Sequence, residues 1–210
     1  LCFHRYRRVR RPCNMTSPVL AGWGIRLEPL AKAHAEGLQQ ASADGGIWKL
    51  HYTTAPGPDI ASVHAYIESA LHAQLKGLCQ PYAVINGDGR ILGSTRFYDM
   101  DEATPTCAIG YTWYAASAQR THVNSACKRL LLAYAFEVIQ ATAVYFHTSH
   151  LNIRSQTAIT RLGANRDGVL RQHKRHKDGS LRDTYVYSIL DHEWPDVRKR
   201  LDGYLAVIGT

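Results

Sequence analysis

The chain has 210 residues, of which 45% are hydrophobic and 20% are charged. This length suits one domain with a sizeable core, and the composition excludes a disordered or fibrous protein. No apolar stretch reaches the roughly 20 residues of a membrane helix, because the longest one, near Leu130 to Ile139, carries Glu137. We therefore expect a globular protein with no membrane partner.

The net charge of +8 is concentrated at the N-terminus, where Arg5, Arg7, Arg8, Arg10 and Arg11 lie within the first 14 residues. We expect residues 1–21 to be a basic arm, flexible or an extension upstream of the natural start, since Met15 follows the arginines. The domain is expected over 22–195, with a C-terminal helix and tail over 196–210. A nucleic-acid-binding or targeting arm is the alternative for residues 1–14, although the arm lacks the apolar stretch of a secretory signal.

The cysteines are odd in number and widely spaced, with no CxxC pair: Cys2, Cys13, Cys79, Cys107 and Cys127. This pattern predicts reduced thiols and a cytoplasmic protein. The eleven histidines include no HExxH sequence. We therefore expect no metal cofactor.

Apolar periodicity and turn residues predict elements in this order: a strand over 25–30, helices over 31–43 and 60–75, strands over 82–85, 91–98 and 107–114, a helix over 125–140, a strand over 143–148, a helix over 152–162, strands over 168–173 and 182–190, and a helix from about Pro195. Asp59 and Asn152 suit N-cap positions, and Gly163 suits a helix end. The unit over 107–148 is a strand, a helix and a strand, which predicts a parallel pairing. The fold class is therefore α+β, with a mixed, mostly antiparallel sheet flanked by helices.

The strand over 107–114 has two different faces if its residues alternate regularly. One face would carry Ile109, Tyr111 and Trp113, and the other would carry Ala108, Gly110 and Thr112. The small residues of the second face would leave room for a cofactor arm or for a packed helix.

The junction from Tyr114 to Ser125 joins this strand to the long helix and is rich in hydrogen-bond donors. Unpaired amides and the helix dipole make such a helix start attractive to phosphate. The alternative is a helix cap followed by an ordinary polar turn.

Four stretches carry a resemblance to a known family: Gly93-Ser94-Thr95-Arg96, Ile109-Gly110-Tyr111-Thr112-Trp113, Gln119-Arg120-Thr121-x-x-Asn124, and Asn152-x-x-Ser155 with Leu162-Gly163-Ala164 after it. From Trp23 to Trp194 the chain resembles the RimJ/RimL-like branch of the GNAT acetyltransferases. The resemblance implies a GNAT-type sheet with a βαβ cofactor unit and acetyl-CoA as co-substrate. The cofactor-binding residues that it implies are Tyr111, Thr112, Trp113, Gln119, Arg120, Thr121, His122, Val123, Asn124, Asn152 and Ser155.

The pyrophosphate loop departs from the superfamily pattern [Q/R]-x-x-G-x-[G/A]. Gln119 matches the first position, but His122 and Asn124 stand where small residues let the backbone approach phosphate. Their side chains must then point away from the phosphate. Arg120 and Thr121 are expected to compensate with side-chain contacts.

The resemblance also implies direct transfer to an amine in a ternary complex, with Asn152 and Ser155 as catalytic residues. A backbone amide near Tyr111 to Trp113 would polarise the thioester carbonyl, and Ser155 would protonate the departing sulfur. Helix capping is the alternative role for both residues. The general base is left open among a water chain and Asp99, Asp101, Glu102, His147 and His51.

The acceptor is expected to be a primary amine of unknown identity: a peptide N-terminus, a polyamine, an aminoglycoside-like drug or an amino acid. The side chains expected to bind it are Trp48, His51, Tyr52, Arg96 and Tyr98, with core packing as the alternative role. A non-catalytic acyl-CoA-binding regulatory domain is the alternative function. A nucleic-acid partner is not expected, and a homodimer is left open.

Overall fold

The computed structural model describes residues 17–208, so residues 1–16 of the arm predicted over 1–21, including all of its arginines, lie outside the described part. The elements, in chain order, are β1 (Leu20–Gly22), β2 (Ile25–Pro29), α1 (Ala35–Ala43), α2 (Ile60–Leu75), β3 (Cys79–Asn86), β4 (Ile91–Asp101), β5 (Thr106–Tyr114), α3 (Val123–Ala133), β6 (Ala143–Ser149), α4 (Ile153–Leu162), β7 (Asn165–Arg175), β8 (Leu181–Leu190) and α5 (Trp194–Ile208). Every predicted helix and strand is present. The short strand β1, which pairs with β2, was not predicted.

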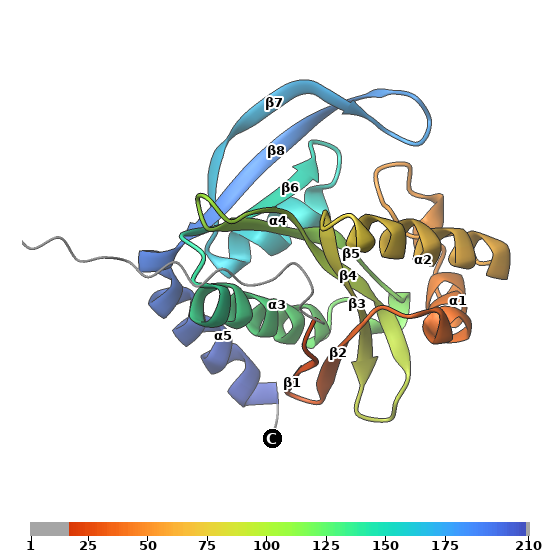
Figure 1. Cartoon of the computed structure of the whole chain (residues 1–210), viewed down its shortest axis with the longest axis horizontal. Helices are drawn as coiled ribbons and strands as arrows, with labels where there is room; N and C mark the ends of the chain where they lie inside the picture. Colours follow the sequence, from red (N-terminus) through yellow and green to blue (C-terminus); the bar gives the residue numbers. More distant parts are fainter. Residues whose placement is uncertain (1–16, 209–210) are drawn as a thin grey trace, which may run out of the picture.

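One sheet of eight strands organises the molecule, in the order β1-β2-β3-β4-β5-β6-β8-β7 (Figure 1). Every neighbouring pair is antiparallel except β5 and β6, which are parallel. The predicted α+β class, with a mixed and mostly antiparallel sheet, is therefore confirmed.

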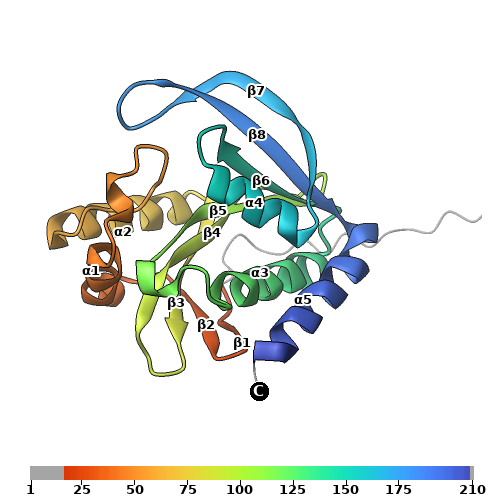
Figure 2. The ribbon, with the colours of Figure 1, turned by 180° about the vertical axis from the view of Figure 1, so that it is seen from behind.

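Helices cover both faces of the sheet around β4. On one face, here called the α2 face, Tyr66 of α2 donates a hydrogen bond to Ser94 Oγ at 3.0 Å. On the opposite face, the α3 face, the ring of Phe97 contacts Tyr134, which continues α3. α5 lies along α3 in both ribbon views (Figures 1 and 2), and the Arg129 guanidinium donates to Asp202 there at 2.7 Å.

β5 and β6 pair over only three residues each. Thr106 to Ala108 of β5 face Ala143 to Tyr145 of β6, and no pairing follows beyond them. β6 continues to Ser149 in full register with β8, whereas β5 continues to Tyr114 beside β4. The sheet therefore divides between β5 and β6 at the ends of these strands from which α3 and α4 begin.

A bulge interrupts β5 beside this division. Tyr111 has a φ of 51°, in the left-handed region. Ser94 pairs with Trp113 and Arg96 pairs with Gly110, so two residues of β5 oppose Thr95 alone. An extra residue of this kind reverses the alternation of side chains along the strand.

The predicted faces of β5 are therefore wrong. Ile109 pairs with Phe97, which lies on the α3 face. Trp113 instead contacts Tyr66 on the α2 face, with ring centroids 6.1 Å apart. Regular alternation would have placed both side chains on one face, and the bulge at Tyr111 separates them.

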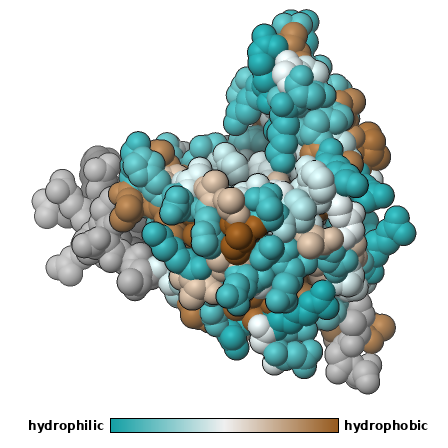
Figure 3. Space-filling model, turned by 90° about the vertical axis from the view of Figure 1, so that its right-hand side faces the viewer, coloured by the Kyte–Doolittle hydropathy of each residue, from teal (hydrophilic) through white to brown (hydrophobic). Residues whose placement is uncertain are grey.

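The hairpin of β7 and β8 extends beyond the rest of the sheet as a long ribbon, which stands out as a largely hydrophilic ridge at the top of Figure 3. Its tip contacts the segment between α1 and α2. The Lys177 amide donates to the His51 carbonyl at 3.2 Å, and Lys177 Nζ donates to the Ala55 carbonyl at 3.0 Å. This ribbon thus brings a distant part of the chain to the divided region of the sheet.

Candidate active site

The loop before α3 is held by its own side chains. Gln119 Nε2 donates to the Tyr114 carbonyl at 3.0 Å. Thr121 Oγ1 donates to the Ala118 carbonyl at 2.7 Å and accepts from the Val123 amide at 3.3 Å. These contacts position the start of the helix, and they engage the hydroxyl that was expected to contact phosphate.

Donors remain available at the start of α3. Within residues 17–208, the amides of Asn124 and Ser125 find no acceptor, and helical bonding resumes at Ala126. Asn124 Oδ1 accepts from the Tyr114 hydroxyl at 3.3 Å, so this side chain points back toward β5. Arg120 is exposed at a φ of 62° and has no partner among the described residues. Two free amides and one free guanidinium suit the binding of a phosphate group.

The start of α4 carries the two predicted catalytic residues. Asn152 is the N-cap, and its Oδ1 accepts from the Ser155 amide at 3.1 Å. The Ser155 side chain is half-buried, and its hydroxyl has no partner in the described part of the chain. Asn152 therefore performs the capping role considered as its alternative, whereas the hydroxyl of Ser155 is available for chemistry.

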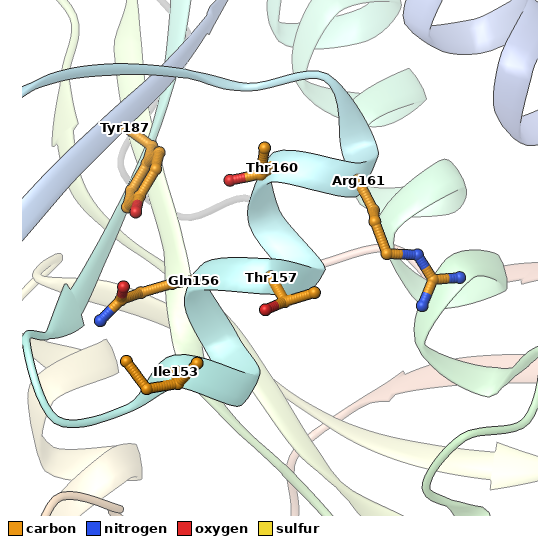
Figure 4. A pocket seen from close by; sticks show the side chains of 6 residues that line it. All are labelled: Ile153, Gln156, Thr157, Thr160, Arg161 and Tyr187. Carbon is orange, nitrogen blue, oxygen red and sulfur yellow. The ribbon is translucent and has the colours of Figure 1, made fainter.

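An open pocket lies against another side of α4 (Figure 4). It is lined by Ile153, Gln156, Thr157, Thr160 and Arg161 of α4 and by Tyr187 of β8. Neither Asn152 nor Ser155 lines this pocket. The pocket and the predicted chemistry therefore lie on different sides of the helix.

Tyr98 and His147 bridge the division of the sheet on the α2 face. The Tyr98 hydroxyl lies 3.0 Å from His147 Nδ1, and the ring of Tyr98 contacts Tyr111 edge-on at 5.1 Å. Burial raises the pKa of Tyr98 and lowers that of His147, although the charge of Asp99 partly opposes the second effect. At neutral pH both groups are therefore uncharged, and His147 can accept a hydrogen bond or a proton.

The small residues of β5 accommodate this tyrosine. Ala108 pairs directly with Tyr98, and a Cβ added at Gly110 would lie 2.8 Å from Tyr98 Cε1. The room expected there for a cofactor arm or a helix is thus occupied by the ring of Tyr98.

The predicted acceptor residues form two groups, of which one reaches β6 through the contact of Tyr98 with His147 and the other through the contact of His51 with His176. Arg96 and Tyr98 lie together on β4, next to Tyr111. His51 contacts Tyr52 at 5.3 Å and His176 at 5.2 Å. Trp48 is partly buried against the main core instead.

His176 links this loop to β6 and was not predicted. Its Nε2 lies 2.9 Å from Ser149 Oγ, and its Nδ1 lies 2.9 Å from Ser180 Oγ. Burial lowers the pKa of His176 below its usual value, and the charge of His51 adds to this effect. No local sequence pattern indicates the contact, because His176 and Ser149 belong to different elements.

Two acidic candidates for the general base lie elsewhere. Asp101 Oδ1 accepts the Ala103 amide at 2.8 Å in the turn between β4 and β5, and Glu102 is exposed in the same turn. This turn precedes β5, whereas the divided region begins after Ala108 of that strand. Among the five candidates, His147 has the direct contact with Tyr98 beside the division.

Lys128 is a buried cation that was not assigned a role. Its Nζ donates to Thr112 Oγ1 of β5 at 3.1 Å and lies 5.9 Å from the ring of Phe146 on β6. Burial lowers the pKa of this lysine to about 8. Lys128 precedes Leu131 and Leu132 at the three- and four-residue spacing of one helix face, a signal that could have revealed its burial.

The described cysteines, Cys79, Cys107 and Cys127, are buried free thiols. Residues 17–208 contain no group of three His, Cys, Asp or Glu side chains arranged to hold a metal ion. None of the helices in this range is both long and apolar enough to span a bilayer.

Comparisons with known proteins agree on one kind of domain. Residues 25–165 match the family described as "Acetyltransferase (GNAT) domain". The provisionally named ribosomal N-acetyltransferase YdaF of Bacillus subtilis (strain 168) is 28% identical over 120 residues, which cover 54% of this chain and 64% of that protein. The chain thus matches less than two thirds of that relative's length.

Solved structures resemble nearly the whole chain. A provisionally assigned acetyltransferase from T. thermophilus is 32% identical, with a TM-score of 0.77 over 91% of this chain and 98% of that one. Mycobacterium smegmatis RimJ, in complex with CoA-disulfide, is 20% identical, with a TM-score of 0.72 over 90% of this chain and 93% of that one. At 20% identity, the likeness to RimJ concerns the fold alone.

Proposed function

Because the chain belongs to the GNAT acetyltransferase family, in its RimJ/RimL-like branch, we propose that it transfers an acetyl group from acetyl-CoA to a primary amine. The amine attacks directly in a ternary complex. The observation that carries this proposal is the division between β5 and β6, with the starts of α3 and α4 on its two sides.

The start of α3 supports the binding of the CoA pyrophosphate. Its Asn124 and Ser125 amides are free, and Arg120 is exposed beside them. The family prefers a small residue at this place, so a larger side chain must leave room for the phosphate. The side chain of Asn124 does so by pointing toward Tyr114. The residues present therefore fit the group, although Thr121 serves the loop itself.

The chemistry needs donors more than it needs an enzyme nucleophile. Acetyl-CoA supplies the acetyl group as a thioester. β5 beyond Ala108 has backbone groups without a β6 partner, and these can donate to a carbonyl oxygen that gains negative charge. The free hydroxyl of Ser155 can supply the proton that the sulfur requires.

The acceptor on this proposal is the N-terminal amine of a protein or peptide, or a small-molecule amine. The provisional name of the relative YdaF, a ribosomal N-acetyltransferase, supports a protein amine. The three buried free thiols support a cytoplasmic location, where reduced cysteines persist.

A second candidate is an acyl-CoA-binding regulatory domain without catalysis. Its support is that Asn152 caps α4 and that His122 and Asn124 replace the small residues of the usual loop. On this alternative the fold and the phosphate-binding helix start are kept, and transfer is absent.

Two measurements separate these functions. Acetyl-CoA at millimolar concentration should raise the melting temperature, and acetyl-CoA with an amine panel should release free thiol. An unchanged melting temperature would contradict both candidates. A raised melting temperature without thiol release from any amine would leave the regulatory domain.

A further inference from the structure

Arg96 is a buried cation without a counter-charge. The residue is only 7% exposed. Its guanidinium lies 4.3 Å from the ring centre of Tyr111 and 5.4 Å from that of Tyr66. No carboxylate within residues 17–208 forms an ion pair with it, and its Nε is buried without an acceptor. Burial raises the pKa of the neighbouring Cys79 thiol, so this thiol stays neutral and does not balance the charge of Arg96.

Arg182 of β8 lies near Tyr111 from another strand, and near Tyr98, since the charges of both tyrosines act on it. It is half-buried, and its Nε also lacks an acceptor in the described part of the chain. Burial lowers its pKa, while Tyr98 and Tyr111 act on it in the opposite direction. The adjacent Asp183 forms no ion pair with it within residues 17–208, and Asp183 Oδ1 accepts from the Gln172 amide at 2.7 Å instead.

Two uncompensated guanidinium groups thus flank the pair of Tyr98 and Tyr111. A buried charge is costly unless an opposite charge and hydrogen bonds accompany it. The planar fork of a guanidinium matches a carboxylate in particular. Tyr111 is 39% exposed, so a ligand can reach this group of side chains from solvent.

We propose that Arg96 and Arg182 bind a carboxylate of the acceptor, and that the acceptor is therefore a primary amine that carries a carboxylate. This inference rests on the proposed function. The two arginines lie on the α2 face beside the division of the sheet, and Tyr98 connects them to His147 of β6. A carboxylate held there orients the rest of the acceptor next to the divided strands.

Matched acceptors test the proposal. One pair of acceptors is alanine and alaninamide, and the other is the dipeptide amides Asp-Ala-NH2 and Asn-Ala-NH2. For each acceptor, the release of free thiol is measured at a saturating concentration of acetyl-CoA. A charged hydrogen-bond partner contributes about 1.5–3 kcal/mol, so kcat/KM should be about ten- to a hundredfold higher for the carboxylate of at least one pair. The pair that responds distinguishes a free amino acid from an acidic peptide. Equal rates within both pairs would overturn the proposal.

Variants connect the preference to the two arginines. Arg182→Gln should remove most of the preference for the carboxylate while the melting-temperature shift with acetyl-CoA persists. Arg96→Lys keeps the charge and loses the fork, and it should reduce the preference as well. Arg171→Gln, an exposed change on the same hairpin, is the control. A preference that survives Arg182→Gln and Arg96→Lys in folded protein would contradict the assignment.

A binding measurement separates this inference from the proposed function. Calorimetric titration compares N-acetylalanine with its amide and needs no turnover. Tighter binding of the carboxylate, lost in Arg182→Gln, would support the site even if no amine released thiol. Thiol release without any carboxylate preference would keep the transferase and reject the carboxylate site.

Discussion

The hydroxyl of Tyr98 lies 3.0 Å from Nδ1 of His147, although β5 separates the strands that carry these residues. The ring of Tyr98 crosses β5 above Ala108 and Gly110. This contact joins the two halves of the sheet at the place where β5 and β6 stop pairing. The position of Tyr98, one of the residues expected to bind the acceptor, therefore depends on the small residues Ala108 and Gly110 of β5.

Gly110→Ala should destabilise the protein by displacing the ring of Tyr98. The new methyl group would meet Tyr98 Cε1 at 2.8 Å, and overpacking of this kind costs about 1–3 kcal/mol. Urea unfolding measures the change. Gly168→Ala is the control, because a Cβ there meets no atom within 4 Å. Equal effects of the two changes would contradict the contact.

Ser155→Ala should slow catalysis while leaving acetyl-CoA binding intact. The hydroxyl has no partner among the described residues, so its removal leaves no buried group unpaired. We expect kcat to fall about tenfold to a hundredfold, at the low end for general acid catalysis because a thiolate leaves readily. Thr157→Ala on the same helix is the control. An unchanged kcat would exclude Ser155 as the acid.

Asn152→Ala should lower the free energy of unfolding by about 1 kcal/mol, because the N-cap of α4 is lost. Asn152→Asp keeps the accepting oxygen and should retain most of the stability. If the capping role is the whole role, the aspartate variant also keeps its kcat. A large loss of kcat in a stable aspartate variant would instead favour a catalytic contact of the asparagine amide.

Arg120→Gly should weaken acetyl-CoA binding and yet stabilise the protein. The φ of 62° suits glycine better than arginine, which is worth up to about 1 kcal/mol. Loss of a charged donor to phosphate should raise the acetyl-CoA Kd about tenfold. Arg120→Lys, which keeps the charge, should lose less affinity. Unchanged affinity in the glycine variant would exclude a phosphate contact.

Lys128→Met should raise stability at neutral pH. Burial lowers the pKa of Lys128 from 10.5 to about 8. Between these two pKa values the unfolded chain holds a proton that the folded chain has released, so the free energy of unfolding rises with pH in this range. Below pH 8 the lysine is charged in both states, and the full cost of burying its charge lowers the stability. The gain in the variant should be on the order of 3 kcal/mol at pH 7 and should shrink toward pH 10.

Urea unfolding at pH 7 and pH 10 checks this dependence, with exposed Lys199→Met as the control. A variant that is less stable than the parent at pH 7 would mean that the contacts of Lys128 with Thr112 and Phe146 outweigh its burial.

Local patterns in the sequence determined the helices, the strands and their order. Asp59 and Asn152 cap helices as predicted, because a cap needs only a side chain and amides two or three residues away. The parallel pairing of β5 and β6 also followed from the order of elements. The family resemblance along these elements was sufficient to indicate a GNAT-type fold, and the comparisons confirm it.

Only the tertiary structure decided the faces of β5 and the surroundings of the acceptor side. The bulge at Tyr111 depends on the pairing with Thr95, which a single strand's alternation does not contain. The approach of Arg96 and Arg182 to Tyr111 brings together residues that are 86 positions apart in the chain. Such contacts depend on register and on the reach of side chains across strands, so periodicity along one strand cannot specify them.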